Sequence, residues 1–89
     1  MNKYLLAYDK NLGTRQQIVD VLNTMAEVRH WRFDMPNTFY IYSDANHNEL
    51  LNKIRMLRGS RGRCVLVKMD TYSGWLPKET WAFLKRTDL

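Results

Sequence analysis

The side chains best suited to chemistry in this sequence are cationic, and they gather in one stretch. Residues 50–69 carry six lysine and arginine side chains and no acid, whereas the net charge of the whole 89-residue chain is only +5. The six are Lys53, Arg55, Arg58, Arg61, Arg63 and Lys68. Clustered cations attract phosphate-bearing partners, because they focus a positive potential on one part of the surface. The alternative is a basic helix end and loop that are simply solvated.

Residues 58–63, Arg-Gly-Ser-Arg-Gly-Arg, form the predicted binding loop. Its two glycines let the backbone turn and expose amide groups, which can form a concave anion site. Its arginines Arg58, Arg61 and Arg63 offer planar forks that match a phosphate group. We expect these three side chains, with Lys68 further along, to contact the ligand. A flexible connection that arginine keeps soluble is the alternative.

Asp9 is the candidate for catalysis. It follows the first predicted strand, and the same carboxylate repeated across a two-fold axis could hold one Mg²⁺ between two chains. Such a metal would activate water for attack on a phosphodiester. We expect the first and last strands to run parallel, which would bring Asp70 to the same sheet edge as Asp9. Capping of the turn at residues 9–13 is the alternative role for Asp9.

No resident metal or other cofactor is predicted. Neither His30 nor His47 has a second ligand at a spacing that zinc sites use. Cys64 is the one cysteine of the sequence, so no disulfide framework is expected, and a buried structural thiol is its predicted role. The single cysteine, the short apolar runs and the lack of a signal-peptide pattern favour a cytoplasmic protein without a membrane span.

Hydrophobic periodicity predicts a β-α-β-β-α-β order followed by a short helix. The expected strands cover residues 3–8, 28–33, 38–43 and 64–69; the expected helices run from Thr14 to 26 or 27, from about 44–46 to Gly59, and from Pro77 onward. This order is typical of the ferredoxin-like α+β fold, an antiparallel sheet in the order 4-1-3-2 with both main helices on one face. We assign residues 1–72 to this domain and 73–89 to a helical extension packed on the domain or on a dimer partner.

Tyrosines on the two central strands predict an aromatic sheet face that the two main helices leave open. The rings concerned are Tyr4, Tyr8, Tyr40 and Tyr42. Such a face needs cover from a partner chain, the tail helix or a ligand. A sheet-to-sheet homodimer would bury it, whereas a nucleic-acid ligand would stack bases on Tyr8, Tyr40 and Tyr42. We expect Tyr4, Trp75 and Trp81 to anchor the dimer or the tail helix.

Both ends of the chain resemble a known group of small proteins. The opening Lys-Tyr-Leu-Leu-Ala-Tyr-Asp at 3–9 and the later Gly-Trp-Leu-Pro-Lys-Glu at 74–79 resemble bacterial and phage proteins labelled SinR-family. That resemblance implies a fold but no biochemistry, and no helix-turn-helix pattern is visible. Tyr8-Asp9 and the element order are also similar to the small CRISPR-associated endonuclease of the spacer-acquisition complex and to virulence-associated protein D. This second resemblance implies a homodimer with Asp9 at the metal-binding position.

These observations predict a small homodimer that binds a nucleic acid or a phosphate-bearing nucleotide without catalysis of its own. The first alternative is a Mg²⁺-dependent nuclease that uses Asp9. The second is a protein-interaction module, for instance a phage protein directed against host defence, that binds through the aromatic face or Trp75.

Overall fold

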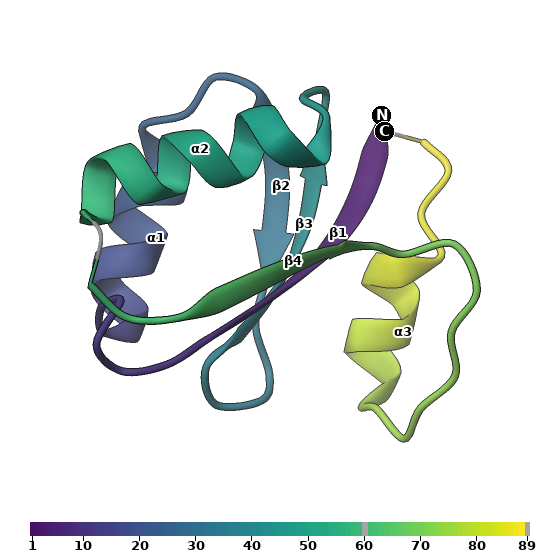
Figure 1. Cartoon of the computed structure of the whole chain (residues 1–89). Helices are drawn as coiled ribbons and strands as arrows, with labels where there is room; N and C mark the ends of the chain where they lie inside the picture. The colour runs from purple at the N-terminus through teal and green to yellow at the C-terminus, as the bar shows by residue number, and fades with distance from the viewer. Residues whose placement is uncertain (60, 89) are drawn as a thin grey trace.

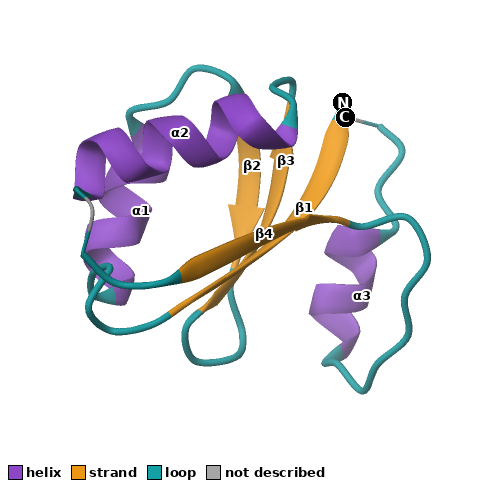
Figure 2. Ribbon diagram, viewed as in Figure 1, coloured by secondary structure: helices purple, strands orange, loops and turns teal. Residues whose placement is uncertain are grey.

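The structure is a computed structural model that describes residues 1–59 and 61–88, and it shows an α+β fold (Figure 1, Figure 2). Within these residues, four strands form one antiparallel sheet and three helices pack on it. The elements are β1 (Asn2–Tyr8), α1 (Arg15–Asn23), β2 (Val28–Arg32), β3 (Thr38–Ser43), α2 (His47–Arg58), β4 (Cys64–Lys68) and α3 (Lys78–Leu84). The strand order is β2-β3-β1-β4, which is the expected 4-1-3-2 order read from the opposite edge. Every helix in the described part of the chain is too short or too polar to span a membrane.

The first helix begins where the capping box predicts and ends earlier than expected. The Thr14 hydroxyl accepts from the Gln17 amide at 3.2 Å, and the Gln17 side chain accepts from the Thr14 amide at 2.8 Å. The expected end at 26 or 27 is wrong, because α1 stops at Asn23. There the Thr24 amide and hydroxyl both donate to the Val21 carbonyl, at 3.1 and 2.7 Å, and this tight turn replaces the α-helical pattern.

The main core lies between the sheet and the helices α1 and α2. The strand register places Tyr4 opposite Ile41 and Leu6 opposite Phe39, and all four side chains are buried against the two helices. Tyr8 belongs to the same core. Directly opposed residues share a face of an antiparallel sheet, so Tyr4 and Tyr8 lie on the helix-covered face. The expectation that they form an open face with Tyr40 and Tyr42 is therefore wrong, and so is the anchoring role expected of Tyr4, whose hydroxyl donates to the Ala45 carbonyl in the core.

Helix α3 covers much of the opposite face of the sheet (Figure 1). The Tyr42 hydroxyl donates to the Phe83 carbonyl at 2.9 Å, and the two rings meet edge to face at 5.1 Å. The Lys3 ammonium donates to the Leu84 carbonyl at 2.7 Å. As a result Tyr40 and Tyr42 are only 2% and 5% exposed, so neither ring offers a platform for a base or for a second sheet.

A polar network fixes the start of α3 to the β2–β3 turn. The Arg32 guanidinium donates to the Thr80 hydroxyl at 3.0 Å, and this hydroxyl donates to the Asp34 carboxylate at 2.7 Å. Thr80 is fully buried. Trp81 stacks on Tyr72 at 6.4 Å and 6°, a contact within the segment that follows β4, whereas Trp75 is 100% exposed.

Candidate functional site

Two loops meet at one end of the sheet, β1–α1 at residues 9–13 and α2–β4 at residues 59 and 61–63. The Asp9 amide donates to the Arg63 carbonyl at 3.0 Å. Gly62 has φ +81°, and a Cβ built on it would lie 2.3 Å from the Leu12 nitrogen and 2.7 Å from the Asp9 carboxylate. Only glycine fits this conformation and this close approach, so Gly62 locks the two loops together. We call residues 9–13, 59 and 61–63 the basic end.

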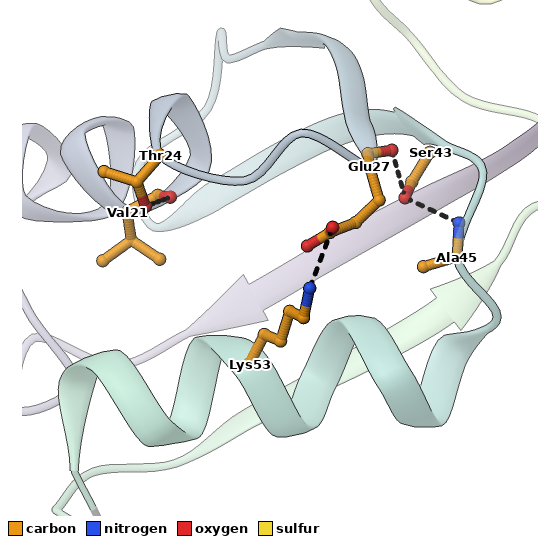
Figure 3. A network of polar contacts seen from close by, with 6 residues as sticks. All are labelled: Val21, Thr24, Glu27, Ser43, Ala45 and Lys53. Atoms are coloured by element: carbon orange, nitrogen blue, oxygen red, sulfur yellow. Dashed lines mark hydrogen bonds and ion pairs between the residues drawn. The ribbon is translucent and has the colours of Figure 1, made fainter.

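The six cations of residues 50–69 have different roles in the folded chain. The Lys53 ammonium forms an ion pair with Glu27 at 2.9 Å, next to the Ser43 hydroxyl, which bonds the Glu27 carbonyl (Figure 3). Arg55 donates to the Gly62 carbonyl at 3.2 Å. Arg58 donates to the Leu12 carbonyl at 2.8 Å and to the Gln17 side chain at 3.2 Å. These contacts assign Arg55 and Arg58 to support of the loops, which corrects the expected role of Arg58 as a ligand contact.

Arg61 and Arg63 project from the basic end into solvent, together with Lys10 from the neighbouring loop. Within the described part of the chain, no hydrogen bond or ion pair engages these three side chains. Sequence reasoning missed Lys10, because the contact between the two loops joins residues about fifty positions apart. A shallow hollow beside Arg63, lined by Tyr8, Asp9 and Cys64 among others, adds a contact surface at the same end.

Two other expected ligand contacts, Lys68 and Tyr8, are not available as predicted. Lys68 is exposed at the far end of β4, four residues from Cys64 and so about 13 Å along the strand. Tyr8 is 7% exposed and packs on Phe39 at 6.0 Å in the main core. Lys68 is therefore separate from Arg61 and Arg63, whereas Tyr8 lines the hollow beside Arg63 but exposes too little of its ring for a base to stack on it.

The Asp9 carboxylate is used within its own turn. One of its oxygens accepts from the Asn11 and Leu12 amides, at 3.1 and 3.2 Å. Hydrogen bonding with the Arg63 backbone, and then with Leu12 and Asn11, lowers the pKa of the Asp9 carboxyl below its usual value of 3.8. The geometry is that of a turn cap whose charged form is favoured.

Asp70 does not join Asp9, and the expected parallel pairing of β1 with β4 is wrong. The two strands are antiparallel, with Tyr8 opposite Cys64 and Tyr4 opposite Lys68. Asp9 and Asp70 therefore lie at opposite ends of the strand pair. Across residues 1–59 and 61–88, no three His, Cys, Asp or Glu side chains gather in a way that could hold a metal ion.

The remaining candidate ligands have structural surroundings. Cys64 is half-buried against the main core, rather than fully buried as expected. His30 meets the Tyr42 ring edge to face at 6.4 Å, and His47 is the exposed first residue of α2.

No family model matches this chain, and no curated protein or solved structure is significantly similar to it.

Proposed function

We propose that this protein binds a nucleic acid through the phosphate backbone, at the basic end, without catalysing a reaction. One observation carries the proposal: Lys10, Arg61 and Arg63 are exposed and, within the described residues, make no hydrogen bond or ion pair, on two loops that Gly62 locks together. A locked loop loses little conformational freedom when it binds, so more of the contact energy is available for affinity. The proposed fold is the ferredoxin-like arrangement, which the strand order supports.

The shape of the basic end favours an extended polyanion over an enclosed small nucleotide. Pockets for small ligands are concave and bury most of the ligand surface. Here the cations stand on projecting loops, and the neighbouring hollow is shallow. Contacts of lysine and arginine with successive phosphates give affinity without base recognition, and they need no enclosed cavity.

The proposal is tested by fluorescence anisotropy with a labelled single-stranded RNA, a duplex DNA and a cyclic dinucleotide. Arg61→Ala/Arg63→Ala should weaken binding of the two polymers and reduce the slope of log affinity against log salt by about 1.4 to 1.8, or roughly 0.7–0.9 for each lost phosphate contact. The matched control, Lys78→Ala/Lys85→Ala, removes the same charge from the α3 segment and should leave the slope near that of the wild type. Equal losses in the two double variants would show that only net charge matters. Binding of the dinucleotide alone would contradict the polyanion proposal.

A further inference from the structure

Two exposed apolar side chains on the α3 side of the sheet lie along β4. Val65 and Val67 are 55% and 46% exposed. They stand opposite Ala7 and Leu5 of β1, on the face where α3 packs but beyond its reach. Trp75, which is fully exposed, lines a hollow of that same face together with Leu5. Val65 and Val67 therefore form a short apolar strip along the outer strand of the sheet.

The outer edge of β4 also offers a regular row of backbone groups that have no partner among residues 1–59 and 61–88. The Arg63 carbonyl accepts from the Asp9 amide, and the Met69 amide donates to the Lys3 carbonyl, so both residues direct their polar groups toward β1. Because these directions alternate along an antiparallel strand, Cys64, Leu66 and Lys68 direct their amides and carbonyls outward. These three alternate residues provide enough outward amides and carbonyls to pair with another strand.

The two edges of the sheet differ in how they discourage such pairing. The opposite edge strand, β2, is interrupted by an irregularity between Val28 and His30 and carries the exposed Arg29. Bulges and charged side chains are the usual means by which natural sheets block edge-to-edge contact. The β4 strand has one exposed charge, Lys68 at its end, but it pairs with β1 in an unbroken register and its other four residues are apolar.

We propose that a second copy of this chain pairs with β4, antiparallel and centred on Leu66. In that register Val65 lies opposite the partner's Val67, and Cys64 lies opposite the partner's Lys68. A two-fold axis perpendicular to the sheet keeps each side chain on its own face, so the four valines gather on one side. The β4 edge of one copy therefore matches the β4 edge of the other, as a two-fold symmetric interface requires. This match favours a second copy of the chain as the partner over an unrelated strand.

The pairing has a consequence for binding, which rests on the proposed function. The two copies of Arg63 would lie six residues apart along the paired strands, or about 20 Å. Both basic ends would then belong to one continuous sheet and could contact one polyanion. Attachment of a single nucleic acid at two points raises the apparent affinity through effective concentration, without any new contact.

The oligomeric state is measured by size-exclusion chromatography with light scattering, in the absence of nucleic acid. We expect wild-type protein at micromolar concentration to have twice the chain mass of 10.7 kDa. Val65→Lys/Val67→Lys should give a folded protein of single chain mass, with circular dichroism as the check on folding. The control Leu57→Lys changes a side chain of matching exposure, 54%, which faces the hollow beside α1, and it should remain a dimer. A monomeric wild type, or a dimeric double valine variant, would overturn the proposal.

A cross-link tests the register itself. Lys68→Cys would place a thiol opposite the partner's Cys64, at the separation of about 5.5 Å between Cα atoms that a disulfide can bridge. Mild oxidation should then give a covalent dimer, and Lys68→Cys/Cys64→Ser should give far less. Equal cross-linking of the two variants would overturn the register. Both measurements are independent of nucleic acid, so a dimer that fails to bind RNA or DNA contradicts the proposed function alone.

Discussion

Replacement of Gly62 by alanine perturbs the contact that holds the basic end together. Gly62 has φ +81°, and the left-handed region costs an ordinary side chain about 1–2 kcal/mol. The new Cβ would also stand 2.3 Å from the Leu12 nitrogen, so the two loops must separate by about 1 Å. Separation weakens the Asp9 to Arg63 backbone hydrogen bond, which is worth about 0.5–1.5 kcal/mol. Alanine also reduces the entropy of the unfolded chain, which offsets roughly 0.4–1 kcal/mol of this loss. We therefore expect the free energy of unfolding to fall by about 1–3 kcal/mol, a large part of the total for a chain of this size.

The chain supplies a matched control at Gly59. Its φ is +82°, but a Cβ built on it meets nothing within 4 Å among the described atoms. Gly59→Ala should therefore cost only the conformational term of about 1–2 kcal/mol, less the roughly 0.4–1 kcal/mol by which alanine reduces the entropy of the unfolded chain. Urea denaturation followed by tryptophan fluorescence measures both variants. If Gly62→Ala costs no more than Gly59→Ala, the loops are not locked together and the reasoning fails.

Three further predictions concern residues whose expected roles the structure changes or refines. Arg58→Ala should lower the free energy of unfolding by about 1–3 kcal/mol in urea, since a charge-assisted bond to the Leu12 carbonyl is lost, whereas Arg61→Ala should stay within about 0.5 kcal/mol. Tyr42→Phe should cost about 0.5–1.5 kcal/mol and speed amide exchange in α3, and unchanged exchange would show that this hydroxyl does not hold the helix. Asp9→Asn should keep nucleic-acid binding but destabilise the fold near neutral pH and not in strong acid. The reason is that folding lowers the pKa of the Asp9 carboxyl, so this group stabilises the fold at pH values above its usual pKa of 3.8 and loses that contribution as the pH falls through its pKa in the folded protein. Loss of a Mg²⁺-dependent nuclease activity in this variant would favour the enzyme alternative.

Local signals predicted the elements well, because they act between neighbouring residues. The Thr14–Gln17 box marks the start of α1 by bonds that span three positions. The aromatic and β-branched run Thr38–Ser43 is a strand over its whole predicted length. The early end of α1 at Asn23 was harder to see, since the apolar spacing continues to Met25 and Val28 while the backbone already turns.

The faces of the sheet could not be predicted from alternation alone. Alternation shows that Tyr40 and Tyr42 share a face and that Tyr4 and Tyr8 share a face, but it does not relate the two strands. That relation depends on the register, which sets Tyr4 opposite Ile41 and not opposite a tyrosine. Both sets of residues are apolar, so burial gave no independent indication of which face the helices would cover.

The direction of β4, in contrast, could have been deduced from the predicted order of elements. A crossover helix returns the chain parallel and a hairpin reverses it. The predicted β-α-β-β-α-β order has one hairpin between two crossovers, so its last strand must run antiparallel to its first, as the pairing of Tyr8 with Cys64 shows. The bond from Arg58 to the Leu12 carbonyl spans 46 residues and depends on tertiary packing, so no local pattern could separate Arg58 from Arg61 and Arg63.

The most direct test of binding at the basic end is a titration of ¹⁵N-labelled protein with a short single-stranded RNA and, separately, with a duplex DNA, followed by amide chemical shifts. We predict saturable shifts of the amides at residues 9–13 and 61–64 and of the side-chain signals of Arg61 and Arg63, with little change in α3. Shifts concentrated in residues 72–84, or no shifts with either nucleic acid, would contradict the assignment of this end as the binding site.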